Sequence, residues 1–207
     1  AFILMEFVDG VTLSVWLRER EPSQAEILAA FAAAGAGLAA AHKKGLVHRD
    51  FKPENLMIAE EGRVVVMDFG LAHAGEGKGL VSLPRSDSAP VSPAEAGVEQ
   101  TLSRSFGTAS QLSVDLTATG ALMGTPAYMA PEQYTTGRTD ARSDQFSFCV
   151  ALWEALYGER PFAGGSLAAL SFAITNGDRR EPPRDADVPS WLRRVVERGL
   201  ATEPEQR

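Results

Sequence analysis

Two short apolar runs separated by a polar turn constrain this chain more than any other feature. Leu56 to Ile58 and Val64 to Met67 have the length and composition of buried strands, and a Glu-Glu-Gly-Arg turn lies between them. This pattern predicts a β-hairpin. Asp50 and Asn55 precede the first strand, and Asp68 follows the second. Because a hairpin returns the chain to its start, we expect these three side chains to share one pocket.

The polar residues around the hairpin belong to recognisable motifs. Residues 48–55 read HRDFKPEN, residues 68–70 read DFG and residues 124–133 read GTPAYMAPEQ. Their order and spacing resemble those of protein kinases, and among these the bacterial serine/threonine kinases. The resemblance covers the whole chain apart from one long insert. It implies an α+β fold that is mainly α-helical: the large C-terminal lobe of a kinase, with a small β-hairpin at the catalytic site.

The resemblance implies a role for each polar side chain of the first two motifs. Phosphoryl transfer needs alignment and charge neutralisation more than covalent chemistry. Asp50 would accept or orient the proton of the attacking hydroxyl, and Lys52 would reach the transferred phosphoryl oxygens. Asn55 and Asp68 would hold the Mg²⁺ of bound ATP, with Mn²⁺ as an alternative, because hard cations prefer oxygen ligands. A lysine at position 52, two residues after Asp50, resembles the pattern of serine/threonine kinases rather than that of tyrosine kinases. The implied substrates are therefore proteins with Ser or Thr hydroxyls.

The third motif resembles the peptide-docking segment of the same family. Thr125 would hydrogen-bond Asp50 and Lys52 in an active geometry. Glu132 would form a buried ion pair with Arg207, which is a structural role. Asp144, at the start of a strongly apolar helix, would anchor the backbone of the catalytic loop.

Residues 1–10 resemble the last strand of the small lobe and the hinge. Backbone groups of Glu6 and Val8 would bond adenine, and Met57 would pack beneath the ring; the alternative for Met57 is a plain core methionine. The Gly-rich loop, strand lysine and helix glutamate of a kinase would lie before Ala1. We therefore expect this chain alone to bind ATP poorly and to transfer phosphate at a negligible rate.

A long segment after the hairpin differs in character. Residues 75–113 are rich in Ser and Pro and lack apolar periodicity, so we expect them to bury little and to form a disordered insert in the activation segment. The large lobe would then comprise residues 11–207. Thr117 and Thr119 lie just before the docking segment, where the family is often phosphorylated. Arg49 would grip such a phosphate; the alternatives are solvated threonines and an ordinary salt-bridged arginine.

Helical periodicity accounts for most of the remaining sequence. We expect helices over 12–20, between Pro22 and Gly45, over 146–157, over 167–175 and from Ser190 onward. Ser23, with Glu26 three residues later, has the pattern of a capping box. In the last helix, Ser190 is expected to be the cap. Its inner face would carry Trp191, Leu192, Val195 and Val196.

Composition excludes several classes. Hydrophobic residues make up 44% and the formal net charge is −7, so a nucleic-acid partner is not expected. Cys149 is the only cysteine, which excludes an internal disulfide and suits a reducing cytoplasm. The longest uncharged run, residues 27–41, is predicted to be too short to span a membrane. The chain reads as a segment of a longer protein, whose parent could be membrane-anchored elsewhere.

Two other classes remain open. A non-catalytic kinase-like binding module would keep the fold, but degenerate kinases tend to lose one of Asp50, Asn55 and Asp68, and all are present. A small-molecule phosphotransferase would not need the docking segment over 124–133. Among kinases, two copies could pair for autophosphorylation.

Overall fold

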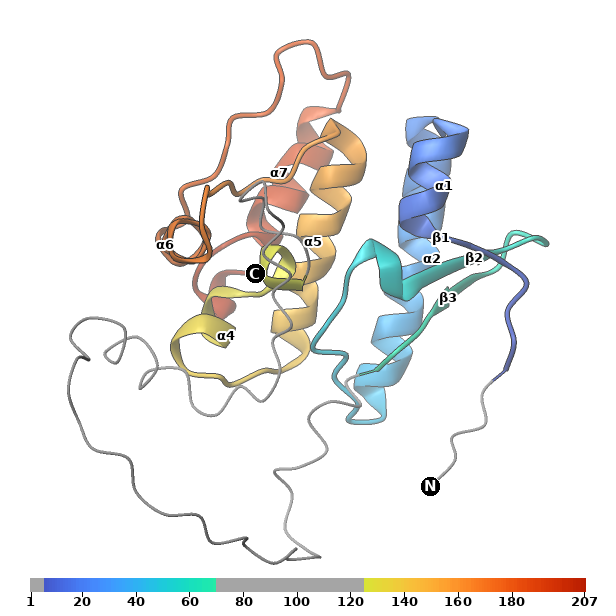
Figure 1. Ribbon diagram of the computed structural model, residues 1–207, viewed down its shortest axis with the longest axis horizontal. Helices are drawn as coiled ribbons and strands as arrows, with labels where there is room; N and C mark the ends of the chain where they lie inside the picture. Colours follow the sequence, from blue (N-terminus) through green and yellow to red (C-terminus); the bar gives the residue numbers. More distant parts are fainter. Residues whose placement is uncertain (1–5, 70–124) are drawn as a thin grey trace, which may run out of the picture.

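The computed structural model describes residues 6–69 and 125–207 (Figure 1). The helices and the sheet formed by residues 10–66 make up one side of the molecule, and the helices of residues 131–199 make up the other. The strands and helices in chain order are β1 (Gly10–Thr12), α1 (Leu13–Arg20), α2 (Gln24–Lys43), β2 (Leu56–Ala59), β3 (Val64–Val66), α4 (Pro131–Thr135), α5 (Ala141–Tyr157), α6 (Leu167–Asn176) and α7 (Ser190–Gly199).

The predicted hairpin is present as β2 and β3. The two strands pair antiparallel, with Leu56 opposite Val66 and Ile58 opposite Val64. The turn between them contains Gly62 at φ 86°, a left-handed conformation that suits glycine. The described residues add a third strand that the sequence did not predict, since β1 pairs antiparallel with the outer side of β2.

The last small-lobe strand expected within residues 1–10 stays a prediction. Residues 1–5 lie outside the described residues, and residues 6–9 have no regular structure. The first strand begins at Gly10, where the chain passes close to the Ile58 carbonyl. A Cβ at this position would come within 2.2 Å of that oxygen, so only glycine permits this approach of β1 to β2.

Helix α2 begins and ends as the sequence predicts. The Ser23 backbone N–H donates to Glu26 Oε2 at 2.8 Å, and Ser23 Oγ accepts from the Glu26 backbone N–H at 3.4 Å. This reciprocal capping box satisfies two donors that the helix start would otherwise leave unpaired. Gly45, at φ 76°, turns the chain away after the last turn.

By length and composition alone, α2 is apolar enough to cross a membrane, which the sequence did not predict. It is the only helix among the described residues that meets this test. A core helix of a soluble protein meets the same test, and α2 contributes Ile27, Phe31, Ala34 and Leu38 to the hydrophobic core. It packs against α5 and β3.

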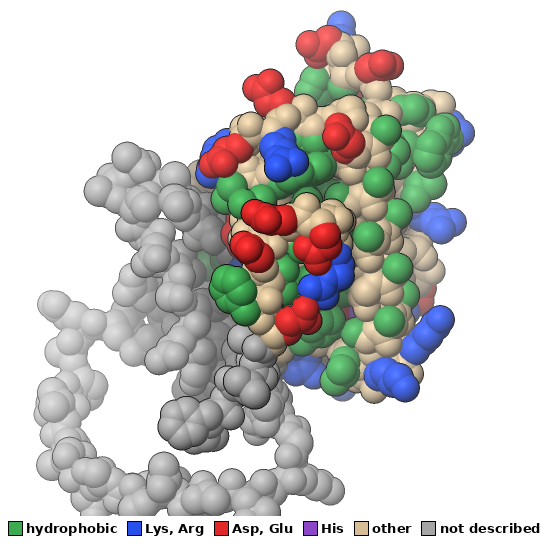
Figure 2. Space-filling model, turned by 90° about the vertical axis from the view of Figure 1, so that its right-hand side faces the viewer, with side chains coloured by type: hydrophobic (Ala, Val, Ile, Leu, Met, Phe, Trp, Pro, Cys, Tyr) green, Lys and Arg blue, Asp and Glu red, His purple; other side chains and the backbone are tan. Residues whose placement is uncertain are grey.

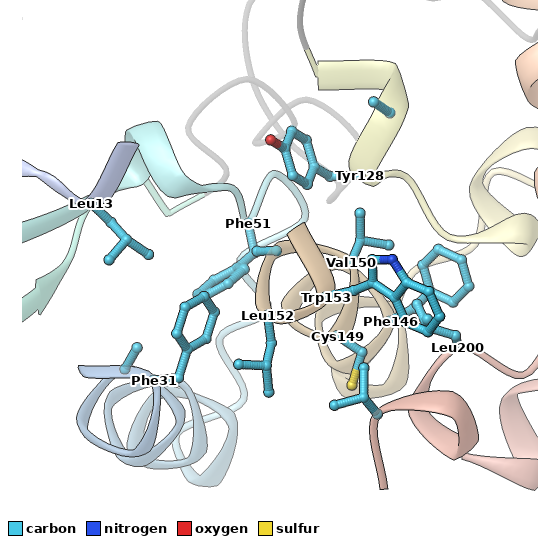
Figure 3. Packing of buried hydrophobic residues seen from close by; sticks show 14 of the residues in the cluster. Leu13, Phe31, Phe51, Tyr128, Phe146, Cys149, Val150, Leu152, Trp153 and Leu200 are labelled. Atoms are coloured by element: carbon cyan, nitrogen blue, oxygen red, sulfur yellow. The ribbon is translucent and has the colours of Figure 1, made fainter. Parts of the chain in front are cut away.

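Helix α5 is the centre of the core, as its apolar sequence predicts. Figure 3 shows Phe31 and Phe51 on one side of this helix and Leu200 on the other. Phe146, Val150 and Trp153 are fully buried. The helix starts at Ala141, five residues earlier than its apolar run, because the Asp140 side chain caps it by accepting from the Arg142 N–H at 2.7 Å.

The prediction for α7 was wrong in two respects. Pro189 is the N-cap and Ser190 is the first helical residue, so the Ser190 hydroxyl makes no capping bond. Leu192 and Val196 are buried, but Trp191 is 56% exposed and Val195 is 55% exposed. Residues four apart share one stripe of a helix, and here α5 covers only the stripe that carries Leu192 and Val196.

Close packing of α7 on α5 leads to a first testable prediction. A Cβ built at Gly199 would lie 2.2 Å from Cys149 Sγ and 3.2 Å from Cys149 Cβ. We expect Gly199→Ala to lower the free energy of unfolding by about 1–3 kcal/mol, the usual cost of overpacking. Gly165→Ala is the matched control, because nothing lies within 4 Å of that Cβ.

Urea denaturation of each variant gives the measurement. Combining Gly199→Ala with Cys149→Ala removes the sulfur and should recover part of the loss. Equal stability of the Gly199 and Gly165 variants would show that α5 and α7 do not pack this closely.

Candidate active site

The catalytic loop places two polar side chains around Asp50. Lys52 Nζ donates to Asp50 Oδ2 at 2.9 Å. Asn55 Nδ2 donates to the Asp50 carbonyl oxygen at 2.8 Å and to Asp50 Oδ2 at 3.2 Å. The Asp50 side chain is 35% exposed, so its carboxylate is positioned by two donors and still reaches solvent. This arrangement can accept a proton from a bound hydroxyl beside a fixed positive charge.

The open end of the hairpin brings Asp68 towards this group. The Met67 N–H donates a hydrogen bond to the Asn55 carbonyl oxygen at 2.8 Å. Asp68 is the next residue after Met67, so its backbone is held near Asn55. Asp68 is exposed and adopts φ 56°, a left-handed conformation that costs a non-glycine residue of the order of 1 kcal/mol or more. Such strain at a polar residue is typical of functional sites.

The donor set suits a cation that is only partly ligated by protein. Asn55 uses its amide nitrogen for Asp50, which leaves its oxygen as the atom able to bind a metal. Within residues 6–69 and 125–207, no group of three His, Cys, Asp or Glu side chains could hold a metal ion alone. An Asn oxygen and one carboxylate are ligands of the kind that a divalent cation takes when phosphate and water complete its shell.

Asp144 of α5 holds the catalytic loop by its backbone. Asp144 Oδ2 accepts from the His48 N–H and Oδ1 accepts from the Arg49 N–H, each at 2.7 Å. His42 Nε2 lies 2.7 Å from the same Oδ2. Asp144 is 1% exposed, and hydrogen bonds to a buried charge are among the stronger ones. They offset the strain at Arg49, whose φ is 70°.

His48 is a packed residue in this structure. It is fully buried, and its Nε2 lies 2.8 Å from the Met67 carbonyl oxygen. Its ring also packs against Phe51 and Phe69. His48 thereby joins the catalytic loop to the end of β3, which fixes the two halves of the site relative to each other.

Arg49 has an unusual environment. Its Nε is buried and has no hydrogen-bond partner among the described residues. A buried polar group without a partner is rare in proteins and calls for a physical explanation. Its guanidinium therefore remains a candidate for binding an anion.

The docking segment is tied to the catalytic loop and to α5. Gln133 Nε2 donates to the Arg49 carbonyl oxygen at 3.2 Å, while Gln133 Oε1 accepts from the Ala130 N–H at 2.8 Å. Tyr128 donates its hydroxyl to Glu154 Oε2 at 2.5 Å. Burial, and then the Glu154 charge, raise the pKa of Tyr128 far above its ordinary value, so the phenol stays protonated.

Arg207 and Glu132 form the ion pair that the sequence predicts. Arg207 Nη1 and Nη2 donate to Glu132 Oε1 and Oε2, both at 2.8 Å. Ser143 Oγ donates to Glu132 Oε1 at 2.7 Å. The Arg207 side chain is fully buried, and it also donates to the carbonyl oxygens of Ala201 and Thr202. This bidentate pair closes the end of the docking segment against the last residues of the chain.

The expected adenine-binding residues lie on β2 and in the segment before β1. Met57 is partly buried in β2, opposite Thr12. The backbones of Glu6 and Val8 make no hydrogen bond to other backbone groups within the part of the chain described. Arg63 Nη2 donates to Glu6 Oε1 at 2.7 Å. No contact here tests their proposed role, which stays a prediction.

Several predicted site residues lie outside the described residues. These are Thr117, Thr119 and the insert over 75–113. The expected bonds from Thr125 to Asp50 and Lys52 also concern a side chain that is not described.

Sequence reasoning missed some residues that the structure connects to the site. Gln133, Ser143, Glu154 and His42 were not predicted to contact it. Gln133 stands inside the docking motif, and His42 falls at helical spacing on the inner face of α2, so both carried a weak signal. The sequence carries no signal for the contacts of Ser143 and Glu154, because their partners are distant in sequence.

A catalytic aspartate, a lysine two residues later, an asparagine five residues later and an aspartate beyond a hairpin define the phosphotransfer site of protein kinases. Residues 1–88 match the family described as protein kinase domain. Residues 99–207 match the family described as protein tyrosine and serine/threonine kinase. The chain belongs to the protein kinase family.

Relatives with similar sequences are mycobacterial. Serine/threonine-protein kinase PknL of Mycobacterium tuberculosis is 35% identical over 210 residues, which cover 100% of this chain and 43% of that protein. Serine/threonine-protein kinase PknB of Mycolicibacterium smegmatis is 34% identical over 208 residues, covering 100% of this chain and 28% of that protein. The chain thus spans less than half the length of these curated relatives.

The Glu132–Arg207 pair leads to a second testable prediction. Burial alone would raise the pKa of Glu132, but hydrogen bonds from Arg207 and Ser143 outweigh burial and lower it below the ordinary value of 4.5. The stabilisation is therefore complete above pH 4.5 and is lost as the pH falls through the lower pKa of the folded protein. We expect Glu132→Gln to reduce the free energy of unfolding at neutral pH by about 3–5 kcal/mol, because it leaves Arg207 buried without its partner charge.

Chemical denaturation between neutral and acidic pH gives the measurement. The gap between wild type and Glu132→Gln should narrow as the solution becomes more acidic than pH 4.5. Glu203→Gln is the control, because Glu203 is exposed and makes no capping bond. A gap that is constant with pH would mean that the ionised carboxylate does not stabilise the fold.

Proposed function

We propose that this chain is the large lobe and hinge of a serine/threonine protein kinase, which transfers the γ-phosphoryl group of ATP to protein hydroxyls. Residues 1–10 would be the last small-lobe strand and the hinge. Residues 11–207 would be the large lobe, with an insert over 75–113 in the activation segment. The observation that carries the proposal is the Asp50 carboxylate, held by Lys52 and Asn55 at the open end of the hairpin. The names of the PknL and PknB relatives support the choice of Ser and Thr.

The proposed reaction assigns one task to each side chain. Asp50 takes or orients the proton of the attacking Ser or Thr hydroxyl, and Lys52 neutralises charge on the transferred phosphoryl oxygens. Asn55 and Asp68 hold Mg²⁺, with Mn²⁺ as an alternative; when bound, the cation neutralises charge on the nucleotide phosphates. Thr125 links substrate docking to Asp50 and Lys52.

The nucleotide would enter between the hinge and the hairpin. Backbone groups of Glu6 and Val8 bond adenine, and Met57 lies beneath the ring. The Gly-rich loop and the strand lysine that contact the phosphates in kinases are not found in this chain. The chain by itself is therefore expected to be inactive, and a polypeptide that supplies those elements is expected to be active in the cytoplasm.

Two observations favour a protein kinase over the other classes. Asp50, Asn55 and Asp68 are all present, which a non-catalytic binding module would not require. Gln133 and Tyr128 connect the docking segment to the catalytic loop and to α5, an arrangement that a small-molecule phosphotransferase would not need.

Phosphate transfer from labelled Mg-ATP to a generic protein substrate tests the catalytic assignment. In a polypeptide that contains the complete kinase domain, we expect Asp50→Asn to reduce the rate by about 10²–10⁴-fold, the usual contribution of a positioned acid–base group. We expect Asp68→Ala to reduce the rate as well, because it removes a carboxylate proposed to hold Mg²⁺. Asp185→Asn is the control, since Asp185 is exposed in the loop before α7. Full activity of either site variant would refute the assignment.

We further propose that Thr117 or Thr119 is autophosphorylated and that Arg49 binds the phosphate. The unpartnered Arg49 Nε among the described residues supports this proposal. Phosphosite mapping should lose the modification in a Thr117→Ala, Thr119→Ala variant and keep it in the matched Ser103→Ala control. Arg49→Lys should reduce any activation that follows phosphorylation, because lysine cannot bind phosphate in bidentate fashion. Unchanged phosphate incorporation in the double variant would exclude these two sites.

A further inference from the structure

A hollow of about 420 Å³ lies between α1, α2 and the turn end of the sheet. This volume is within the range of binding pockets in proteins. None of the catalytic residues described above lines it. Ile58 of β2, which lines the hollow, lies three residues from Asn55, roughly 10 Å along a strand. A molecule bound in this hollow would therefore leave the Asp50 carboxylate accessible.

The hollow has an apolar floor. Trp16 of α1 and Ala30 of α2 are nearly buried beneath it, and Ile58 contributes from β2. Val11 is 41% exposed at the edge strand, and Ala33 is an exposed small side chain on α2. The small side chains on α2 leave room between this helix and the sheet, so an apolar side chain of a partner could enter.

The rim of the hollow is acidic. Three acidic residues, Asp9, Glu26 and Glu60, line the rim, whereas Arg20 is the one basic residue that lines it. Figure 2 shows this side of the molecule, where acidic side chains gather around apolar ones. Within the described ranges, Asp9 and Glu60 have no hydrogen-bond or ion-pair partner for their side chains, whereas Glu26 is engaged by the α2 capping box. Two carboxylates are thus available to an incoming cation.

We propose that this hollow is a docking groove for an extended segment of a partner protein that carries Lys or Arg beside a large apolar side chain. The apolar side chain would lie on Trp16 and Ala33, and the basic side chains would pair with Asp9 and Glu60. Charge complementarity of this kind favours encounter and selects against acidic competitors. Binding of this segment does not depend on phosphotransfer.

A second copy of this chain fits the groove less well. A symmetric pair would place the same patch on both copies, so the carboxylates of the two rims would face each other. The chain as a whole also carries a formal net charge of −7. Like charges placed opposite each other at an interface oppose association.

Fluorescence anisotropy with a synthetic peptide tests the proposal on the complete protein. The probe is an extended peptide of about twelve residues in which arginines alternate with leucines. One comparison peptide has glutamate in place of each arginine, and another has serine in place of each leucine. We expect saturable binding of the first peptide alone, weakened at high salt because screening reduces exposed charge pairs.

Matched variants locate the binding. We expect Asp9→Lys with Glu60→Lys to weaken binding at least about tenfold, while Asp178→Lys with Asp185→Lys makes the same change in net charge and leaves binding unaltered. Ala33→Trp should fill the hollow and abolish binding, whereas Ala39→Trp, at another exposed alanine of α2, should not.

Three outcomes would overturn the proposal. One is the absence of saturable binding by the basic apolar peptide. Another is an equal loss of binding with both pairs of charge variants, which would indicate general electrostatic attraction. The third is a concentration-dependent dimer in sedimentation that Ala33→Trp disrupts, which would assign the groove to a second copy.

Discussion

The carboxylate of Asp144 is the interaction on which the site depends most. It comes from the first turn of the most buried helix and accepts hydrogen bonds from two consecutive backbone N–H groups of the catalytic loop. A loop of this length would otherwise sample many conformations, at an entropic cost of about 1–2 kcal/mol for each residue fixed. Because α5 is held by the core on several sides, the position of its first turn is fixed. The hydrogen bonds to Asp144 therefore fix the position of the catalytic loop as well.

The same helix organises the other half of the molecule. Ser143 precedes Asp144 and donates to Glu132, while Ser147, one turn later, donates to the Tyr128 carbonyl oxygen at 2.7 Å. One face of α5 therefore holds both the loop that carries Asp50 and the segment that would present a substrate. This shared support explains how residues from distant parts of the sequence can keep a constant geometry.

The hairpin, the α2 capping box, the central helix and the Glu132–Arg207 pair could all be predicted from sequence. The first three rest on local sequence patterns, and the ion pair rests on the resemblance to protein kinases. Strand β1 could not be predicted, because its three residues carry no alternation and form a strand only by pairing with β2. The outward direction of Trp191 and Val195 was missed for a related reason, since an apolar pattern indicates a helix face but not how widely neighbours cover it. The contact of Glu154 with Tyr128 depends on tertiary packing alone.

The tight contact between Gly199 and Cys149 has a chemical consequence. Cys149 is the only cysteine, and burial raises the pKa of its thiol to about 12. Because the thiolate is the reactive form, alkylating or oxidising agents should spare the native protein. Modification of this sulfur would then require α7 to move away from α5, so the lone thiol acts as an internal reporter of how often that interface opens.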